Sequence, residues 1–349
     1  MQMQPFDQAI SSLPGELQQL LSRVDPTVRQ IINEIRLRVG RPLILIDQHG
    51  HPHFISENGQ TFRTLQIDSF CMPRPLLDEC VRSMSDYSLH SVQNSLQNGF
   101  LTLRGGHRAG FSGNVAWEEG RVTAVRRVDS INIRIARSIV GAADRITGFY
   151  RANEFAGTLI IGPPASGKTT ILKDLCRQLS NGDIGEYYKV SLIDERGEIA
   201  ASYRGEPQND VGWNTDVFDG YSKPIGFDIA VRCMSPDVIV CDEIGVNGDP
   251  ESLLQGVNSG SAVVATIHSS SLDEFLHKKN SKELLASGAF RYFVFLGSAK
   301  QAGTVREIIR YDEICRDVSI IHHIGAGGTD VFGSSEKTGQ GTGTLSGIH

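Results

Sequence analysis

The sequence has few cysteines, and none of them has the spacing of a metal or redox site. Its 349 residues include six cysteines, and no two form a Cys-x-x-Cys pair. A structural zinc site or a thioredoxin-like redox site therefore has no support. Cys176 and Cys241 fall in expected core elements, where a cysteine acts as a small apolar side chain. This usage favours a reducing, cytoplasmic environment.

The chain also lacks a long apolar run. Residues 1–14 show no basic region followed by an apolar core, so no secretory signal is expected. The uncharged stretch from Ser252 to Leu272 is rich in Ser, Gly, Gln and Asn, and we do not expect it to span a membrane. A membrane role would have to come through partners, so we expect a cytoplasmic protein that associates peripherally with a membrane complex.

Positive charge is not in excess. The net charge is -6 at pH 7, which argues against nucleic-acid binding by the whole surface. Arginines are dense between residues 121 and 137, so a basic face for nucleic acid or an acidic partner stays an alternative. No aromatic residues alternate with these arginines to stack on bases, and nucleic acid is therefore not the expected partner.

The first 150 residues predict a small α+β domain. Apolar residues recur at helical spacing in two short helices between residues 12 and 36, and again between residues 74 and 98. Alternating patterns predict strands at 34–39, 43–46, 52–55, 100–103, 113–117, 122–125 and 131–137. The segment 141–156 is rich in small residues and is interpreted as the link to a second domain at 151–324. Residues 325–349 are rich in Gly, Ser and Thr and predict a disordered tail.

The second domain begins with a phosphate-binding loop. Gly162, Pro163, Pro164, Ala165, Ser166, Gly167, Lys168 and Thr169 match G-x-x-x-x-G-K-[ST] between an apolar strand and a helix that starts near Thr170. Such a loop surrounds phosphate oxygens with main-chain N–H groups, and the following helix adds its positive end. Lys168 would reach the β- and γ-phosphates, and the Thr169 hydroxyl would bind Mg²⁺.

Polar residues end three further strands of this domain. Strand and helix patterns alternate through it, which predicts a mainly parallel sheet covered on both faces. Asp194-Glu195 follows the strand 190–193, Asp242-Glu243 follows the strand 238–241, and His268 follows the strand 262–267. Carboxyl ends of parallel strands face one crevice, so Asp242 is expected at the Mg²⁺. Either Glu243 or Glu195 would activate the attacking water, and His268 would sense the γ-phosphate.

The order of these motifs resembles that of the secretion-type ATPases of type II secretion, type IV pili and type IV secretion. The resemblance is carried by five segments: Arg36 to Pro42, the phosphate loop, Asp194-Glu195, Arg232 to Glu243 and Asn258 to His268. It implies a RecA-like P-loop NTPase core that binds ATP and Mg²⁺ and hydrolyses ATP. Residues that would contact the nucleotide, in the same or a neighbouring subunit, are Arg134, Arg137, Arg196 and Arg232.

Within that group the chain is similar to the stage III sporulation AA family of endospore-forming bacteria. This similarity rests on Gly105 to Arg108, Asn132 to Arg137, Asp194 to Ile199, Pro207 to Gly212 and Met234 to Gly245, and covers residues 12–324. It implies a homo-oligomeric ring, expected to be a hexamer, in the mother cell. The ring would dock on the membrane channel proteins of the sporulation secretion complex and energise assembly of, or transport through, the mother cell–forespore channel.

Two positions depart from the family pattern. Asn214 stands where an arginine is expected, and Val246-Asn247-Gly248 stands where a basic residue is expected. Hydrolysis could therefore be slow or differently supported. The alternatives are a scaffold that binds ATP to set ring geometry with little turnover, and a nucleic-acid-dependent ATPase.

Overall fold

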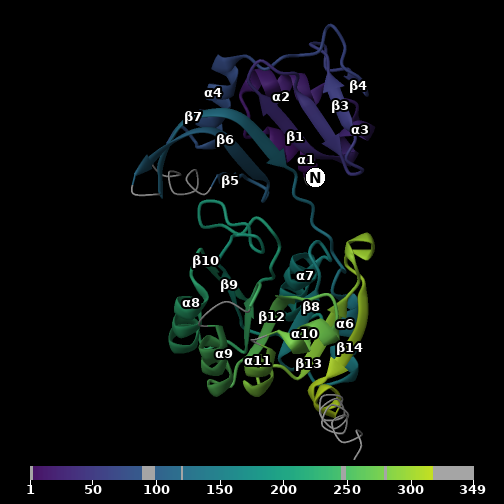
Figure 1. Ribbon diagram of the computed structural model, residues 1–349, viewed down its shortest axis with the longest axis vertical. Helices are drawn as coiled ribbons and strands as arrows, with labels where there is room; N and C mark the ends of the chain where they lie inside the picture. The colour runs from purple at the N-terminus through teal and green to yellow at the C-terminus, as the bar shows by residue number, and fades with distance from the viewer. Residues whose placement is uncertain (1–2, 89–98, 119–120, 245–248, 279–280, 317–349) are drawn as a thin grey trace, which may run out of the picture. The chain divides into compact units, whose positions relative to one another are not determined.

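The computed structural model describes residues 3–88, 99–118, 121–244, 249–278 and 281–316. These residues form two seven-stranded sheets, one built from β1–β7 and the other from β8–β14 (Figure 1). The predicted tail at 325–349 lies outside the described residues, as does the predicted helix over 89–98. Among the helices of the described ranges, none is long and apolar enough to cross a bilayer.

The first sheet is antiparallel, in the order β4-β3-β2-β1-β7-β6-β5. Strands β6 and β7 are longer than the sequence pattern predicts and pair along their whole length. The elements of this part are α1 (Pro5–Ile10), α2 (Gly15–Ser22), α3 (Pro26–Ile31), β1 (Ile32–Arg38), β2 (Ile44–Asp47), β3 (Pro52–Ile55), β4 (Thr61–Phe62), α4 (Arg74–Met84), β5 (Phe100–Thr102), β6 (Arg108–Glu118) and β7 (Arg121–Arg134).

One predicted helix boundary in this part is wrong. The spacing of Val28, Ile31, Ile32 and Ile35 suggested a helix to residue 36, but α3 ends at Ile31 and β1 starts at Ile32. Ile32 and Ile35 belong to strand β1, and both are fully buried in the first core. Strand β1 pairs with β2 on one side and with β7 on the other, which supplies main-chain hydrogen bonds. This tertiary pairing outweighs the preference for a helix that the spacing of the apolar residues indicated.

His107, in the turn before β6, is fully buried. Its Nδ1 accepts a hydrogen bond from the Ala136 N–H at 3.0 Å. Burial, followed by the nearby Arg137 charge, lowers the pKa of His107 to about 4. An unfolded histidine titrates near pH 6.5, so on acidification the unfolded chain takes up the proton first. This contribution to stability is complete above about pH 6.5 and is lost as the pH falls towards 4.

We therefore expect the free energy of unfolding to fall by about 2 kcal/mol between pH 7 and pH 5 because of His107. The variant His107→Asn offers an amide oxygen to the Ala136 N–H but does not titrate, so its stability should lose this part of the pH dependence. Urea unfolding of both proteins at the two pH values measures the difference. Equal pH slopes would show that His107 is not the group responsible.

The second sheet has the order β10-β9-β11-β12-β8-β13-β14, and the pairs from β10 to β13 are parallel. The strands β13 and β14 are neighbours at one edge of this sheet. The elements are α6 (Asp144–Ala152), β8 (Thr158–Gly162), α7 (Lys168–Asn181), β9 (Val190–Asp194), β10 (Thr215–Asp219), α8 (Lys223–Ile229), a π-helical turn (Ala230–Met234), β11 (Val238–Cys241), α9 (Asp249–Asn258), β12 (Ala262–His268), α10 (Leu272–His277), α11 (Ser281–Ala286), β13 (Tyr292–Leu296), a 3₁₀ turn (Ala299–Gln301) and β14 (Val305–Arg310).

Helices cover both faces of this sheet. Val238, Val240 and Val264 belong to one core cluster with the apolar side of α7. The alternate residues Ile239 and Val263 meet α9 at Gly256 on the other face. The predicted α/β fold with a mainly parallel sheet, preceded by an α+β part, is confirmed.

Three elements of this part were not predicted. The segment 141–156, interpreted as a link, contains α6, whose Ile146 and Tyr150 are buried in the second core. Strand β10 and the helix α8 after it lie between two predicted strands. The predicted domain limits at 150/151 and 324/325 stay predictions.

Candidate nucleotide site

The predicted phosphate loop lies between the buried strand β8 and the helix α7. Gly162 ends β8, and α7 begins at Lys168. Ala165 and Gly167 both have left-handed main-chain angles, with φ of 57° and 91°. A Cβ atom at position 167 would also come within 2.7 Å of the Gly303 nitrogen. Position 167 therefore requires glycine both for its conformation and for the close approach of the 303 segment.

Lys168 folds back over the loop. Its Nζ donates hydrogen bonds to the carbonyl oxygens of Gly162 at 2.8 Å and Pro163 at 2.9 Å. Burial lowers the pKa of Lys168, while the carboxylates of Asp242 and Glu243 oppose that shift. The Lys168 ammonium is thus held at the loop, and the two carboxylates that follow β11 offset its positive charge.

The start of α7 suits a phosphate group. No side chain caps its first turn, which contains Thr169 and Thr170. The Ser166 side chain is fully buried, and within the described part of the chain its Oγ has no hydrogen-bond partner. An uncapped helix start, a buried free hydroxyl and the Lys168 ammonium are together the donors that phosphate oxygens accept.

Asp242 joins the loop to the neighbouring strands. Thr169, 73 residues away in sequence, donates from Oγ1 to Asp242 Oδ2 at 3.1 Å. Thr266 of β12 donates to the other carboxylate oxygen, Oδ1. Hydroxyl and carboxylate oxygens are ligands that Mg²⁺ prefers, so the pair Thr169–Asp242 fits a magnesium ion beside the phosphates.

Glu243 lies next to this pair in a constrained conformation. Its φ is 39°, and its N–H donates to Thr266 Oγ1 at 2.9 Å. Its Oε2 forms an ion pair of 2.7 Å with Nη1 of Arg196, and both side chains are largely exposed. The residues after β9 and β11 are therefore in contact, as expected for neighbouring strand ends.

The other acidic strand end is built differently. Asp194 is 1% exposed and accepts the N–H groups of three residues, Glu198, Ile199 and Ala200, at 2.8–3.1 Å. Burial raises the pKa of Asp194, and these hydrogen bonds oppose the shift. Asp194 thus stabilises the turn after β9 instead of facing a ligand.

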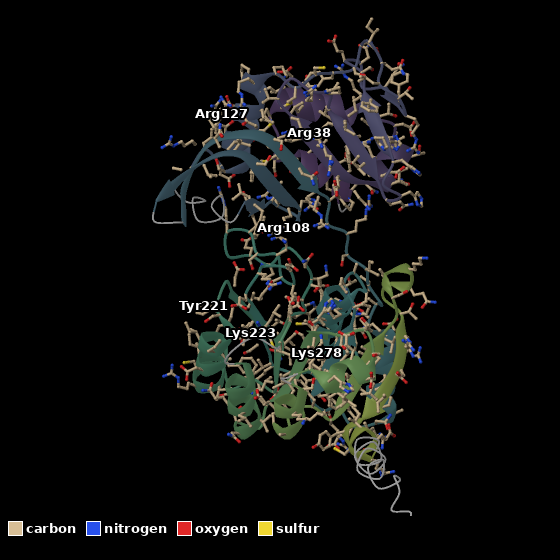
Figure 2. The ribbon with its side chains drawn as sticks, viewed as in Figure 1. Arg38, Arg108, Arg127, Tyr221, Lys223 and Lys278 are labelled. Carbon is tan, nitrogen blue, oxygen red and sulfur yellow. The ribbon has the colours of Figure 1, made fainter. Side chains whose placement is uncertain are left out.

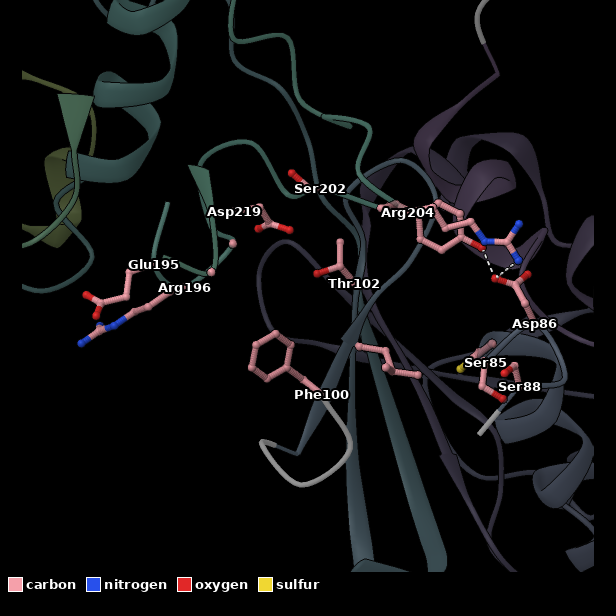
Figure 3. Close-up of a pocket in the computed structure, with 15 residues that line it drawn as sticks. Ser85, Asp86, Ser88, Phe100, Thr102, Glu195, Arg196, Ser202, Arg204 and Asp219 are labelled. Carbon is pink, nitrogen blue, oxygen red and sulfur yellow. Dashed lines mark hydrogen bonds and ion pairs between the residues drawn. The ribbon is translucent and has the colours of Figure 1, made fainter. Parts of the chain in front are cut away.

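Glu195 is bound to a lysine that the sequence did not indicate. Its Oε2 lies 2.9 Å from Nζ of Lys223, whose side chain is only 9% exposed. Figure 3 shows Glu195 and Arg196 after β9, with Asp219 at the end of the adjacent β10.

His268 ends β12 directly opposite Gly162 in the parallel register. Burial and the charges of Lys168 and Lys278 lower its pKa. The fold therefore brings His268 to the phosphate loop, together with Lys278, which no sequence motif marked.

The predicted arginines do not share one location. Arg232 lies in the π-helical turn before β11, at the amino-terminal edge of the parallel sheet, and forms an ion pair with Asp228. Within one chain it is at the opposite edge from the loop, so a nucleotide contact would need a neighbouring subunit. Arg134 ends β7 of the first sheet, and Arg137 follows it and donates to the Ile32 oxygen at 2.8 Å.

Of the two positions where the sequence differs from the family pattern, the structure describes Asn214. Asn214 precedes β10, where its side-chain amide donates to the main-chain oxygen of Tyr188 at 3.1 Å and its main-chain oxygen accepts the Val190 N–H. It thus joins two strand starts at the edge away from the loop. Val246 lies outside the described residues.

The chain is similar in sequence to known proteins. The family described as sporulation stage III, protein AA, matches residues 4–317. Stage III sporulation protein AA of Bacillus subtilis (strain 168) is 36% identical over 302 residues, which are 86% of this chain and 93% of that protein.

Solved structures show the same fold at lower identity. The Legionella pneumophila ATPase DotB has a TM-score of 0.51 at 16% identity, over 83% of this chain and 80% of that chain. The pilus retraction motor PilT, solved with bound ADP, has a TM-score of 0.52 at 15% identity, over 85% and 86%. The RecA-like fold predicted for the second sheet and its helices is thereby confirmed.

Proposed function

Because the chain belongs to the sporulation stage III protein AA family, we propose that it is a Mg²⁺-dependent ATP hydrolase of the secretion-motor kind. The observation that carries this proposal is the 3.1 Å contact between Thr169 of the phosphate loop and Asp242 after β11. It joins the two parts that a P-loop hydrolase needs, the phosphate loop and the carboxylate for the metal.

The polar residues at the phosphate loop have roles that their surroundings support. The Ser166 hydroxyl, the first turn of α7 and the Lys168 ammonium would bind phosphate oxygens. Thr169 and Asp242 would hold Mg²⁺. The metal, when bound, would neutralise charge on the phosphate oxygens. His268, opposite Gly162, would contact the terminal phosphate.

Glu243 is the group we assign to activate water. It follows the metal-binding Asp242 directly, and its exposed ion pair with Arg196 can exchange with solvent or ligand. Glu195 instead neutralises the buried Lys223, which ties it to the packing of α8. A charge partner for a buried lysine cannot leave without cost, so Glu195 is proposed as a positioning residue.

We further propose the assembly and the site of action. Domains at 1–150 and 151–324 would form subunits of a hexameric ring in the mother-cell cytoplasm, with Arg134, Arg137 and Arg232 available to a neighbouring subunit. The ring would dock on membrane channel proteins and energise assembly or transport between mother cell and forespore.

Phosphate release tests the hydrolase proposal. We expect Lys168→Ala to lower Mg²⁺-dependent phosphate release from the full-length oligomer at least about 100-fold, because a preorganised charge at the phosphates is lost. Lys189→Ala is the control, since Lys189 pairs with Asp237 at the opposite edge of the sheet. Equal release by wild type and Lys168→Ala would refute hydrolysis at this site. ATP-dependent assembly with negligible release by wild type would instead indicate a scaffold.

A further inference from the structure

Lys278 is fixed in place by the short helix before it. Ser271 accepts the Glu274 N–H at 3.1 Å and the Glu274 carboxylate accepts the Ser270 N–H at 2.7 Å, which together cap the start of α10. Phe275 in the same helix is fully buried and packs against Phe293 of β13, with ring centroids 6.0 Å apart. Lys278 follows the last residue of α10, so its main chain starts from an anchored position.

The side chain of Lys278 turns to the strand end that carries His268. Its Nζ donates a hydrogen bond to the main-chain oxygen of His268 and lies 3.4 Å from Oε1 of Glu274. The side chain is 34% exposed, so the ammonium is half-buried but accessible. Figure 2 labels Lys278 in the part of the chain that forms the second sheet.

The peptide group between His268 and Ser269 shows on which side of β12 this ammonium lies. The Ser269 N–H points to β8, where it donates to the Gly162 oxygen at 3.3 Å. In a trans peptide the carbonyl points the opposite way, so the His268 oxygen faces β11. The Thr266 oxygen has the same direction and accepts the Ile244 N–H at 2.8 Å. Lys278 therefore approaches the site from the side of Asp242 and Glu243, whereas Lys168 lies over β8.

The two ammonium groups act on each other. The charge of Lys278 is one of the causes that lower the pKa of both Lys168 and His268, after burial. Three cationic or protonatable groups thus lie at the same edge of the sheet as the carboxylates of Asp242 and Glu243. A polyphosphate with several negative charges would relieve the repulsion between the two lysines.

We propose that Lys278 is a phosphate-binding residue whose ammonium contacts the terminal phosphate of the nucleotide from the β11 side of the site. This inference rests on the proposed function and adds a second lysine to the phosphate loop's own. It gives the site a second lysine from within the same chain, which the motif order alone did not indicate.

Binding of a non-hydrolysable ATP analogue and of ADP, each with Mg²⁺, tests the assignment. Lys278→Gln can still donate to the His268 oxygen but has no charge. We expect it to weaken binding of the ATP analogue at least about 10-fold, as for loss of one charge-assisted contact, and to change ADP affinity less than about 2-fold. Lys278→Arg, which keeps the charge, should bind the analogue within about 3-fold of wild type. Lys189→Gln is the matched control for removal of a distant lysine.

The outcomes separate the two claims. A wild-type protein that binds neither nucleotide overturns the proposed function and this assignment together. A wild type that binds both, with Lys278→Gln weakening both equally or neither, overturns the assignment of Lys278 alone. Equal weakening accompanied by a lower urea midpoint would show that the contact with His268 is structural.

Discussion

Replacement of Glu243 by glutamine is expected to lower the rate of ATP hydrolysis at least about 100-fold, the range that general-base catalysis contributes. Glutamine keeps the size of the side chain and can still accept a hydrogen bond from Arg196, but it cannot take a proton from water. Binding of the ATP analogue should stay near the wild-type value, because Lys168, Thr169 and Asp242 are unchanged. Phosphate release under saturating Mg²⁺-ATP, together with the analogue affinity, measures both effects.

The matched variant is Glu195→Gln, which tests the other acidic strand end. It removes the carboxylate that pairs with the buried Lys223 at 2.9 Å, so we expect a lower urea midpoint and a smaller loss of turnover. The assignment would be reversed if Glu195→Gln abolished turnover at unchanged stability while Glu243→Gln remained active. Full turnover in both variants would exclude either residue as the base.

The phosphate loop could be predicted from the sequence because its chemistry is local. Gly167 must adopt a left-handed conformation and the next residues start a helix, so eight consecutive residues specify the structure. The buried strands β8, β11 and β12 were equally predictable, since each is a short, mainly apolar run that leads into a motif residue, Gly162, Asp242 or His268. Their parallel pairing then placed Asp242 and His268 near the loop.

The β10 edge of the same sheet could not be predicted in this way. Strand β10 carries Asp216 and Asp219, and only Phe218 is buried in it. Such a strand forms because the main chain of β9 offers hydrogen bonds along one side, which is a tertiary effect without a hydrophobic pattern. Helix α6 was missed for a related reason, since its buried Ile146 and Tyr150 stand among small and polar residues.

The residues that contact Glu195 and His268 could not be predicted from the sequence either. Lys223 and Lys278 come from helical segments with no nucleotide motif, and only the folded chain brings them to Glu195 and His268. The sequence signal for Lys278 is its place ten residues after His268, directly after the capped six-residue helix α10. That spacing has meaning only once β12 and α10 are known.

The role of Asp194 shows how similar sequence patterns can serve different purposes. Both Asp194-Glu195 and Asp242-Glu243 follow apolar strands, so the sequence pattern alone does not distinguish their roles. The structure gives Asp242 contacts to two threonine hydroxyls of the site. Asp194 instead accepts hydrogen bonds from the main-chain N–H groups of the turn at 198–200. Asp194 therefore stabilises the turn after β9, and its replacement should lower the free energy of unfolding.

Asp194→Ala is expected to lower the free energy of unfolding by about 3 kcal/mol or more, because three N–H groups at the buried turn lose their acceptor. Asp194→Asn keeps one oxygen acceptor and should lose roughly half as much. Urea unfolding without nucleotide measures both, and Asp216→Ala, on the exposed side of the neighbouring β10, should stay within about 0.5 kcal/mol of wild type. If Asp194→Ala unfolded at the wild-type urea concentration but lost turnover, Asp194 would belong to the chemistry, and both acidic strand ends would then face the nucleotide.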